Sequence, residues 1–233
     1  MPTFYIDQKA VSFEPGQTII QAALAAEIYI PHLCFHPEFV PHGSCRVCVV
    51  EVNGRLLSSC TTPATEGCHV NNMGAEVQAH RRQLLEMLFV EGNHVCPSCE
   101  KSGDCTLQSV AEYCGMLTSE FTYQFPNRPL DASHADFILD YNRCILCELC
   151  VRASRDVDHK SIFSIRGRGH DAHLVVNAQD GQLGSTDFAI HDRAAHVCPV
   201  GVILPRDKGF KVPIGRRTFD QHAINETSDT DDR

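Results

Sequence analysis

Cysteine is the residue that most constrains how this chain can fold. Thirteen cysteines occur in 233 residues, and several of them lie in Cys-x-x-Cys runs. These runs are Cys45–Cys48, Cys96–Cys99, Cys144–Cys147 and Cys147–Cys150. Four further cysteines lie apart from the runs: Cys34, Cys60, Cys105 and Cys198. A Cys-x-x-Cys turn directs two thiolates at one point, which suits a metal ion or a metal–sulfur cluster. The sequence therefore predicts a scaffold for three metal centres.

The composition bounds the compartment and the partners. Thirteen cysteines cannot all pair in disulfides, and the N-terminus lacks the basic and apolar regions of a secretory signal. We therefore expect a cytoplasmic protein, in which such cysteines are metal ligands. No apolar run is long enough to span a bilayer. The net charge of −9 argues against nucleic acid as a partner, because phosphate binding requires a basic surface.

Residues 1–76 have the pattern of a small mixed sheet with one helix. Two apolar runs within residues 4–13 predict a hairpin, and Asn53-Gly54 between apolar runs predicts a second one. Thr18 is expected to cap a helix over Ile19–Glu27. A long loop that carries cysteines follows this helix.

Residues 77–116 are expected to form two helices joined by a cysteine-rich loop. The helices are predicted over Val77–Val90 and Thr106–Tyr113. Leucine and phenylalanine supply the apolar face of the first helix. Three residues are expected on its polar face: Arg81, Arg82 and Glu86.

Residues 117–213 begin with a polar, proline-bearing connection. A short strand is predicted over 137–141, and a helix over Val151–Val157 follows the last cysteine run. Three residues of this helix are expected to face outward: Arg152, Arg155 and Asp156. Residues 214–233 form the C-terminal tail. Its final stretch, Asn225–Arg233, is acidic and has no apolar side chain, so we expect that stretch to be disordered or ordered by a partner.

Set one consists of Cys34, Cys45, Cys48 and Cys60. A plant-type two-iron ferredoxin has the same order, with clustered cysteines on a loop and a distant fourth one. The first gap is longer here than in that pattern. The uneven spacing and the hairpin setting favour [2Fe–2S] over a four-cysteine zinc site. The loop histidines are expected on the surface or in packing: His32, His36 and His42.

Set two consists of His94, Cys96, Cys99 and Cys105. A four-iron cluster needs four ligands, and His94 is the nearest candidate for the fourth. A neutral imidazole would leave the cluster less negative and tune its potential. Cys114 or Cys68 as the fourth ligand, or His94 as a simple loop residue, are the alternatives.

Set three consists of Cys144, Cys147, Cys150 and Cys198. Three close cysteines with a remote Cys-Pro are typical of one [4Fe–4S] ligand set of a bacterial ferredoxin. A zinc site rarely uses this spacing. Cys68 and Cys114 remain outside the three sets and are expected to be buried structural cysteines.

The order of these motifs resembles a known family. A two-iron ferredoxin-like segment, a His/Cys segment and a Cys-x2-Cys-x2-Cys run with a remote Cys-Pro occur in the N-terminal part of the large iron–sulfur subunit of complex I. Iron-only hydrogenases and NAD-linked formate dehydrogenases share this order. The short form is similar to the small diaphorase subunit of soluble NAD-reducing nickel–iron hydrogenases. Many relatives have His-x3-Cys before set two, where this chain has Gly92 at the aligned position and His94-x-Cys96.

The resemblance implies an α+β protein with a defined domain order. The N-terminal β-grasp 2Fe–2S ferredoxin-like domain covers 1–76, and a small helical His/Cys iron–sulfur segment covers 77–116. A C-terminal α+β 4Fe–4S ferredoxin-like domain covers 117–213, and the tail covers 214–233. The expected cofactors are one 2Fe–2S and two 4Fe–4S clusters.

The resemblance also implies a function. The chain would be a subunit of a hydrogen:NAD oxidoreductase that transfers electrons and carries no complete active site. It would lie between a flavin/NAD-binding diaphorase subunit and the small and large nickel–iron hydrogenase subunits, which would hold FMN, NAD and the nickel–iron centre. An equivalent subunit of a NAD-linked formate dehydrogenase or another complex I-related enzyme is the alternative within this class. A zinc scaffold and a free redox carrier are alternatives of other classes.

Overall fold

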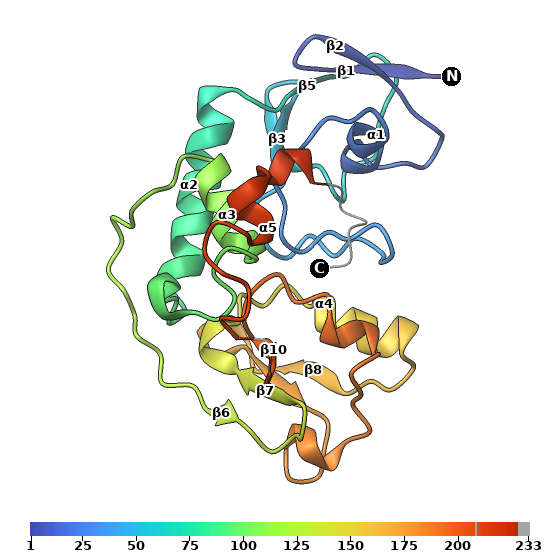
Figure 1. Cartoon of the computed structure of the whole chain (residues 1–233). Coiled ribbons are helices and arrows are strands. Elements are labelled where there is room, and N and C mark those ends of the chain that lie inside the picture. The colour runs from blue at the N-terminus through green and yellow to red at the C-terminus, as the bar shows by residue number, and fades with distance from the viewer. Residues whose placement is uncertain (208, 228–233) are drawn as a thin grey trace.

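The computed structural model describes residues 1–207 and 209–227. The N-terminal domain lies at one end of the molecule and the C-terminal domain at the other (Figure 1). Helices α2 (Ala75–Val90) and α3 (Thr106–Tyr113) lie along one side (Figure 1). This arrangement confirms the α+β class expected from the sequence.

The N-terminal domain is a five-stranded sheet with one helix, α1 (Ile19–Ala25). The strand order is β2-β1-β5-β3-β4. The strands are β1 (Thr3–Ile6), β2 (Lys9–Ser12), β3 (Val49–Val52), β4 (Arg55–Ser58) and β5 (His69–Asn71). Strand β5 pairs with β1 in parallel and with β3 antiparallel, so this three-residue central strand joins the two hairpins into one sheet.

Helix α1 begins where its cap predicts. The Thr18 side chain accepts from the backbone N–H of Gln21, and the Gln21 side chain accepts from that of Thr18. Apolar residues of α1 and of the sheet form one core, in which Phe4, Ile19 and Ile20 are fully buried. The sheet and helix therefore support the loop between them, which carries Cys34, Cys45 and Cys48.

Arg81 corrects the predicted polar face of α2, because it is fully buried. Its guanidinium donates to the backbone oxygen of Val49 at 2.7 Å and to the backbone oxygen of Asn72 at 2.9 Å. It also donates to the Asn72 side-chain oxygen at 2.7 Å. Buried polar groups require such partners, so Arg81 joins α2 to the N-terminal sheet.

We expect Arg81→Met to destabilise the protein by about 3 kcal/mol, because it leaves three buried oxygens without their charged donor. The urea midpoint should fall by about 1 M at an m-value of about 3 kcal/mol/M. Arg82→Met is the matched control, since the neighbouring Arg82 is exposed. Equal midpoints for the two variants would show that the buried contacts of Arg81 contribute little.

Glu86 is a second correction to the predicted face of α2. It is buried, and it accepts from the backbone N–H groups of Glu120 and Phe121 and from the Ser119 hydroxyl. These bonds hold the connection after α3 against α2. This connection then runs along the outside of the helices to the C-terminal domain (Figure 1).

The C-terminal domain contains two small antiparallel sheets. One has the order β10-β7-β6, and the other is the hairpin of β8 and β9. The strands are β6 (Leu130–Asp131), β7 (Phe137–Asp140), β8 (Phe163–Arg166), β9 (His173–Val176) and β10 (Ile203–Pro205). Helix α4 (Leu149–Arg152) continues as a π-helical turn over Ala153–Val157. The apolar residues of this domain and of the α2–α3 region form one core.

Short 3₁₀ turns complete the described secondary structure. They are Cys96–Ser98, Tyr141–Arg143, Gly169–Asp171, Leu183–Ser185, Arg193–Ala195 and Ile224–Glu226. Two of them stand directly beside predicted ligands: one begins at Cys96 and another ends just before Cys144.

The end of the chain differs from the expected tail. Residues 214–227 include α5 (Thr218–Gln221) and the turn Ile224–Glu226, and Ile224 is buried. Arg217 donates to the backbone oxygen of Ser102 at 2.9 Å, which ties this segment to the loop before α3. The predicted tail, Asn225–Arg233, begins inside this turn, so its first residues are ordered, and its remainder, 228–233, lies outside the described residues. Buried Ile224 and half-buried Phe219 anchor the segment before it to the core.

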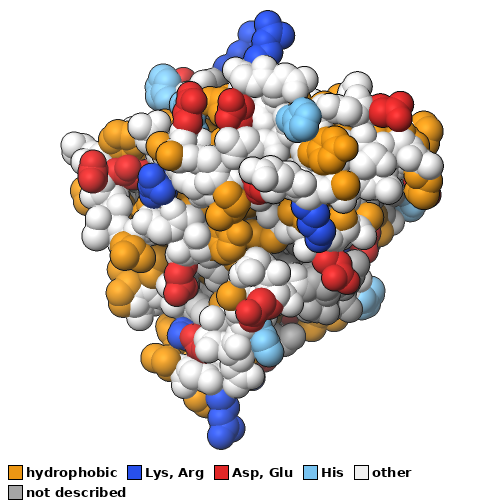
Figure 2. Space-filling view, turned by 90° about the horizontal axis from the view of Figure 1, so that it is seen from above, with side chains coloured by type: hydrophobic (Ala, Val, Ile, Leu, Met, Phe, Trp, Pro, Cys, Tyr) orange, Lys and Arg blue, Asp and Glu red, His pale blue; other side chains and the backbone are white. Residues whose placement is uncertain are grey.

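On the face shown in Figure 2, Lys and Arg side chains stand apart from one another among acidic and apolar groups. This face therefore has no continuous basic patch. Among the described residues, no helix has both the length and the apolar character needed to cross a membrane.

Candidate metal centres

The structure brings the four thiols of set one together. All four are buried, and the backbone N–H of Cys45 points at the Cys34 sulfur at 3.4 Å. The Cys34 thiol forms hydrogen bonds with the thiols of Cys45 and Cys60, and Cys60 forms another with Cys48. The four sulfurs are therefore contiguous, although Cys34 and Cys60 lie on opposite sides of a hairpin in the sequence.

These hydrogen bonds lower the pKa values of two thiols of set one and raise those of the other two. The hydrogen bond with Cys45 is the main reason that the pKa of Cys34 is lowered. The hydrogen bond with Cys60 is the main reason that the pKa of Cys48 falls to about 6. The pKa values of Cys45 and Cys60 are raised, chiefly because each is the partner of Cys34. Two of the four sulfurs thus favour the thiolate form even without a bound cation.

Left-handed backbone residues shape the ligand loops. Arg46, Leu146 and Glu148 have φ values of 59°, 53° and 58°, and each lies between two predicted ligands. Such a conformation is costly for a residue with a side chain, and it curls successive N–H groups toward one point. Backbone N–H groups accordingly donate to the sulfurs two residues earlier, as Leu146 does to Cys144 and Leu149 does to Cys147.

Set three also converges in space. Cys147 and Cys150 are buried, and Cys144 and Cys198 are half-buried. The charge of Cys198 raises the pKa of each of the other three thiols, so Cys198 lies within electrostatic reach of all of them. The chain between Cys150 and Cys198 forms the β8–β9 hairpin and the loop after it, which return Cys198 to the run.

The four residues of set two line one cavity, together with Phe89 and Arg143. The His94 Nε2 atom is buried there, and none of the described residues forms a hydrogen bond with it. Burial is the main reason that the pKa of His94 falls to about 4, and Arg143 and Arg128 lower it further. The imidazole is therefore neutral at pH 7, and Nε2 is free to act as a metal ligand.

Gly92 explains the unusual spacing before set two. A Cβ atom at Gly92 would lie 2.6 Å from His94 Nε2. The imidazole of His94 thus occupies the space in which a side chain at position 92 would begin. The His-x-Cys sequence consequently presents an imidazole near the position from which a His-x3-Cys sequence would present one. Glycine at 92 is required, because any side chain would displace the ring.

The buried thiols of sets two and three are suited to a centre that contains several cations. Burial raises the pKa of Cys105 to about 12 and that of Cys144 to about 11. It also raises those of Cys147 and Cys150 well above the usual value. Such thiols ionise only when a metal supplies positive charge, as iron does in an iron–sulfur cluster. In the described part of the chain, no three His, Cys, Asp or Glu side chains are placed to hold one metal ion. The ligands of an iron–sulfur cluster are instead distributed over several iron atoms.

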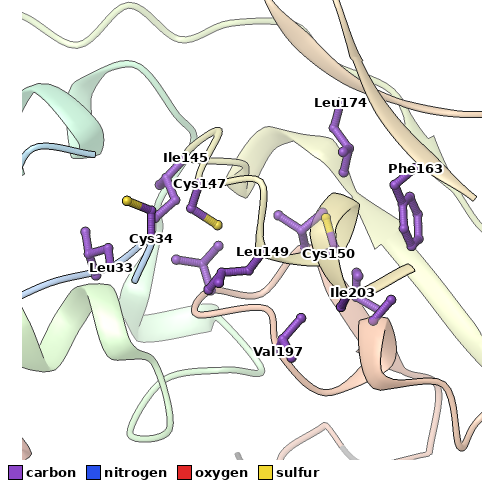
Figure 3. Packing of buried hydrophobic residues seen from close by; sticks show 14 of the residues in the cluster. Leu33, Cys34, Ile145, Cys147, Leu149, Cys150, Phe163, Leu174, Val197 and Ile203 are labelled. Carbon is purple, nitrogen blue, oxygen red and sulfur yellow. The ribbon is translucent and has the colours of Figure 1, made fainter. Parts of the chain in front are cut away.

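Set three contacts both other sets. Figure 3 shows Cys147 and Cys34 side by side, and the charge of Cys34 raises the pKa of Cys147. On the other side, the Cys105 thiol lies 3.8 Å from the backbone oxygen of Pro199, which follows Cys198. The Thr106 N–H donates to the same oxygen at 2.9 Å. The spatial arrangement of the three sets therefore differs from their order in the sequence.

Arginines lie beside these sites, and the sequence pattern did not single them out. Arg143 lines the cavity of set two and pairs with Glu100 at 2.7 Å and with Asp140 at 2.8 Å. Arg128 donates to the backbone oxygen of Cys144 at 3.3 Å. The position of Arg143, directly before Cys144, was the one available signal.

The two remaining cysteines, Cys68 and Cys114, are both buried, as the sequence predicts. All thirteen cysteines are free thiols. His32 is buried, and its ring nitrogen contacts the backbone oxygen of Ile30 at 2.7 Å, which is a packing role.

Three family models match the chain in succession. A 2Fe–2S iron–sulfur cluster binding domain matches residues 1–73. The NADH-ubiquinone oxidoreductase-G iron–sulfur binding region matches residues 81–120, and a 4Fe–4S single cluster domain matches residues 137–204. Each matched range contains all four residues of one set. Together the three models agree with one 2Fe–2S and two 4Fe–4S clusters.

Curated relatives are similar over most of this chain. It is 38% identical to the gamma subunit of the NAD-reducing hydrogenase HoxS of Cupriavidus necator, over 94% of this chain and 93% of that protein. It is 33% identical to one subunit of the NADH-quinone oxidoreductase of Pseudomonas putida, over 88% of this chain and 23% of that protein. The alpha subunit of the NADPH-Fe(3+) oxidoreductase of Geobacter sulfurreducens is 29% identical over 91% of this chain. The chain spans about a quarter of the length of these last two relatives.

A solved structure has the same fold over nearly the whole chain. It is a chain in the crystal structure of NAD+-reducing [NiFe]-hydrogenase in the H2-reduced state, with a TM-score of 0.95 and 52% sequence identity. The match covers 98% of this chain and 97% of that one.

Proposed function

Since this chain belongs to the family of the gamma subunit of NAD-reducing hydrogenase, we propose that it is the electron-transfer subunit of such a hydrogenase. It would carry single electrons between a subunit that binds flavin and NAD(H) and a nickel–iron hydrogenase module. The observation that carries this proposal is the position of the set three loop against the loops of both other sets. Ser44 donates to the backbone oxygen of Leu146 at 2.8 Å, and the Cys105 thiol lies 3.8 Å from the backbone oxygen of Pro199. This position would bring three redox centres together in one chain.

Each set of ligands has its own proposed cluster. Set one would hold a 2Fe–2S cluster through Cys34, Cys45, Cys48 and Cys60. Set two would hold a 4Fe–4S cluster through His94, Cys96, Cys99 and Cys105. Set three would hold a 4Fe–4S cluster through Cys144, Cys147, Cys150 and Cys198. The unpartnered His94 Nε2 in the cavity of set two is the support for histidine as a ligand.

The protein's own residues hold, shield and tune these centres. When bound, each cluster accepts and releases one electron at a time. The buried thiolates anchor iron, and the curled ligand loops donate N–H groups to the sulfurs, which stabilises negative charge there. The neutral His94 imidazole would make its centre less negative than four thiolates do.

The partners follow from the family. We propose a hetero-oligomer with a flavin/NAD-binding diaphorase subunit and with the small and large nickel–iron hydrogenase subunits, which would hold FMN, NAD and the nickel–iron centre. A cytoplasmic location fits the thirteen free thiols, because the cytoplasm keeps thiols reduced.

The metal content of the anaerobically purified complex tests this proposal. The proposed clusters require about ten irons in this chain, from two, four and four. We expect matching acid-labile sulfide, little zinc and three reducible EPR signals from this subunit, all reduced by NADH when the flavin subunit is present. Iron and sulfide should be measured on the separated subunit, with signals compared before and after separation.

Two results would contradict the proposal in different ways. Two or three zinc ions without sulfide would indicate a structural zinc module. A full complement of iron that NADH and hydrogen cannot reduce would show that the clusters are present but serve another pair of partners.

A further inference from the structure

Arg152 lies in the interior, although the sequence pattern places it on an outward face. It is the last residue of α4, two residues after Cys150, and only 4% of its surface is exposed. Arg155, one turn further on, has a side chain that is 58% exposed. The prediction of an outward Arg152 is wrong because the loop of set one packs over this side of α4.

The guanidinium of Arg152 joins the ligand loops of sets one and three. It donates to the backbone oxygens of Cys34 and of Cys147, the latter at 3.3 Å. It also donates to the backbone oxygen of Val40 at 3.0 Å and to that of Glu148 at 3.3 Å. Two of its four acceptors therefore belong to predicted iron ligands, one from each set, which lie side by side (Figure 3).

No carboxylate among the described residues forms an ion pair with Arg152. Its partners are four backbone oxygens and the ring of Phe39, whose centroid lies 5.6 Å from the guanidinium carbon. Burial of a cation is costly unless negative charge lies nearby. Asp156 lies within electrostatic reach of this guanidinium, but it pairs with Arg155 at the surface. The buried negative charge next to Arg152 would be that of the thiolate-ligated centres.

We infer that Arg152 is a positioning residue that holds the loops of sets one and three together and raises the reduction potentials of both centres. This inference rests on the proposed function, because it requires clusters at both sets. Each cluster becomes more negative on reduction, and a fixed cation nearby stabilises the reduced form. Loss of the cation should therefore lower both potentials.

Arg143, beside set two, shows why Arg152 is distinct. Arg143 has two carboxylate partners, Glu100 and Asp140, at 2.7 and 2.8 Å. These two carboxylates offset part of the charge that Arg143 exerts on set two. The groups in contact with Arg152 oppose its charge only with carbonyl dipoles and one ring, so it acts more strongly on the neighbouring centres.

Two substitutions in the intact complex separate the charge of Arg152 from its hydrogen bonds. Arg152→Gln keeps amide donors but removes the charge, whereas Arg152→Lys keeps the charge with fewer donors. Arg155→Gln is the matched control, since Arg155 lies three residues after Arg152 in the following turn and pairs with Asp156 in solvent. EPR-monitored redox titration gives the midpoint potential of each centre, and iron analysis shows that the centres are assembled.

We expect Arg152→Gln to lower the ratio of reduced to oxidised centres at sets one and three about tenfold at a fixed potential, a shift of about 59 mV for a one-electron couple. The centre at set two should keep its potential. Arg152→Lys should restore most of the shift, and Arg155→Gln should have no effect.

Other outcomes overturn the inference. Assembled centres with unchanged potentials in Arg152→Gln would show a structural role only. Equal shifts in the lysine and glutamine variants would show that hydrogen bonds, not charge, set the potential. If Arg152→Gln fails to assemble clusters, the lysine variant alone decides, because lowered potentials there contradict the role of charge. Absence of iron–sulfur signals in the unaltered complex would instead refute the proposed function.

Discussion

Replacement of Cys198 by alanine is expected to remove the centre of set three and to leave the other two. The charge of Cys198 acts on all three remaining thiols of the set, so its loss leaves a four-iron cluster with three ligands. Iron should fall from about ten to about six per chain. Hydrogen-driven reduction of NAD should be lost as well, because the loop of set three is the one that contacts both other sets. Iron analysis and EPR of the anaerobic complex measure both changes.

Cys68→Ala is the matched control for that experiment. Cys68 is buried in the N-terminal core and belongs to none of the three sets. The Cys68→Ala variant should keep about ten irons and full activity, with at most a modest loss of stability from the small cavity. Retention of every EPR signal in Cys198→Ala would refute the assignment of set three, and iron loss in Cys68→Ala would assign Cys68 to a centre.

Replacement of His94 by alanine is expected to remove the centre of set two, again with a loss of about four irons. His94→Cys should rebuild the centre with a thiolate in place of a neutral imidazole. The added negative charge should lower its midpoint potential by on the order of 100 mV, judged from the histidine-for-cysteine exchange in two-iron centres. A redox titration of the set two signal measures this shift.

His80 on α2 provides the control, since its side chain is about half exposed and pairs with Glu76 at 3.9 Å, away from the three sets. His80→Ala should leave iron content and all potentials unchanged. An unaltered set two signal in His94→Ala would show that His94 is not a ligand. In that case Cys114→Ala and Cys68→Ala would identify which cysteine supplies the fourth sulfur.

Burial of the thiols has a consequence for assembly. Because burial raises the pKa values of Cys105 and Cys144 to about 12 and about 11, these sites hold neutral thiols at pH 7 until iron arrives. Set one differs, because its internal hydrogen bonds lower the pKa values of Cys34 and Cys48. We therefore expect metal binding to release a proton from each of Cys105 and Cys144, whereas Cys34 and Cys48 can bind as thiolates that are already formed.

The spacing of the cysteines predicted which of them form local groups, and the order of the motifs predicted the α+β class of the fold. The spacing within Cys45–Cys48 and Cys144–Cys150 keeps those thiols near one another along the chain, and the left-handed residues between them turn them toward one point. Helix α3 has the bounds that its periodicity predicts, and both N-terminal hairpins form where their turns predict. The family and the α+β class, inferred from the order of the motifs, were confirmed.

Tertiary structure decided the features that depend on distant segments. Strands β5 and β10 have three residues each and no local signal, because their partners in the sheets stabilise them. Arg81, Glu86 and Arg152 are polar in the pattern but buried, since other segments supply their hydrogen-bond partners. A helical period shows where polar residues lie around a helix, but not which neighbouring segment will cover them.

The same limit applies to the ligands. The sequence predicted three centres but not how they are arranged, whereas packing placed the loop of set three against those of both other sets. The family pattern His-x3-Cys left open whether His94 is the fourth ligand of set two. In the structure, the imidazole of His94 occupies the space next to Gly92. Covalent spacing specifies contacts over a few residues. Contacts between segments tens of residues apart depend on which apolar faces are buried together, and only the folded chain shows that.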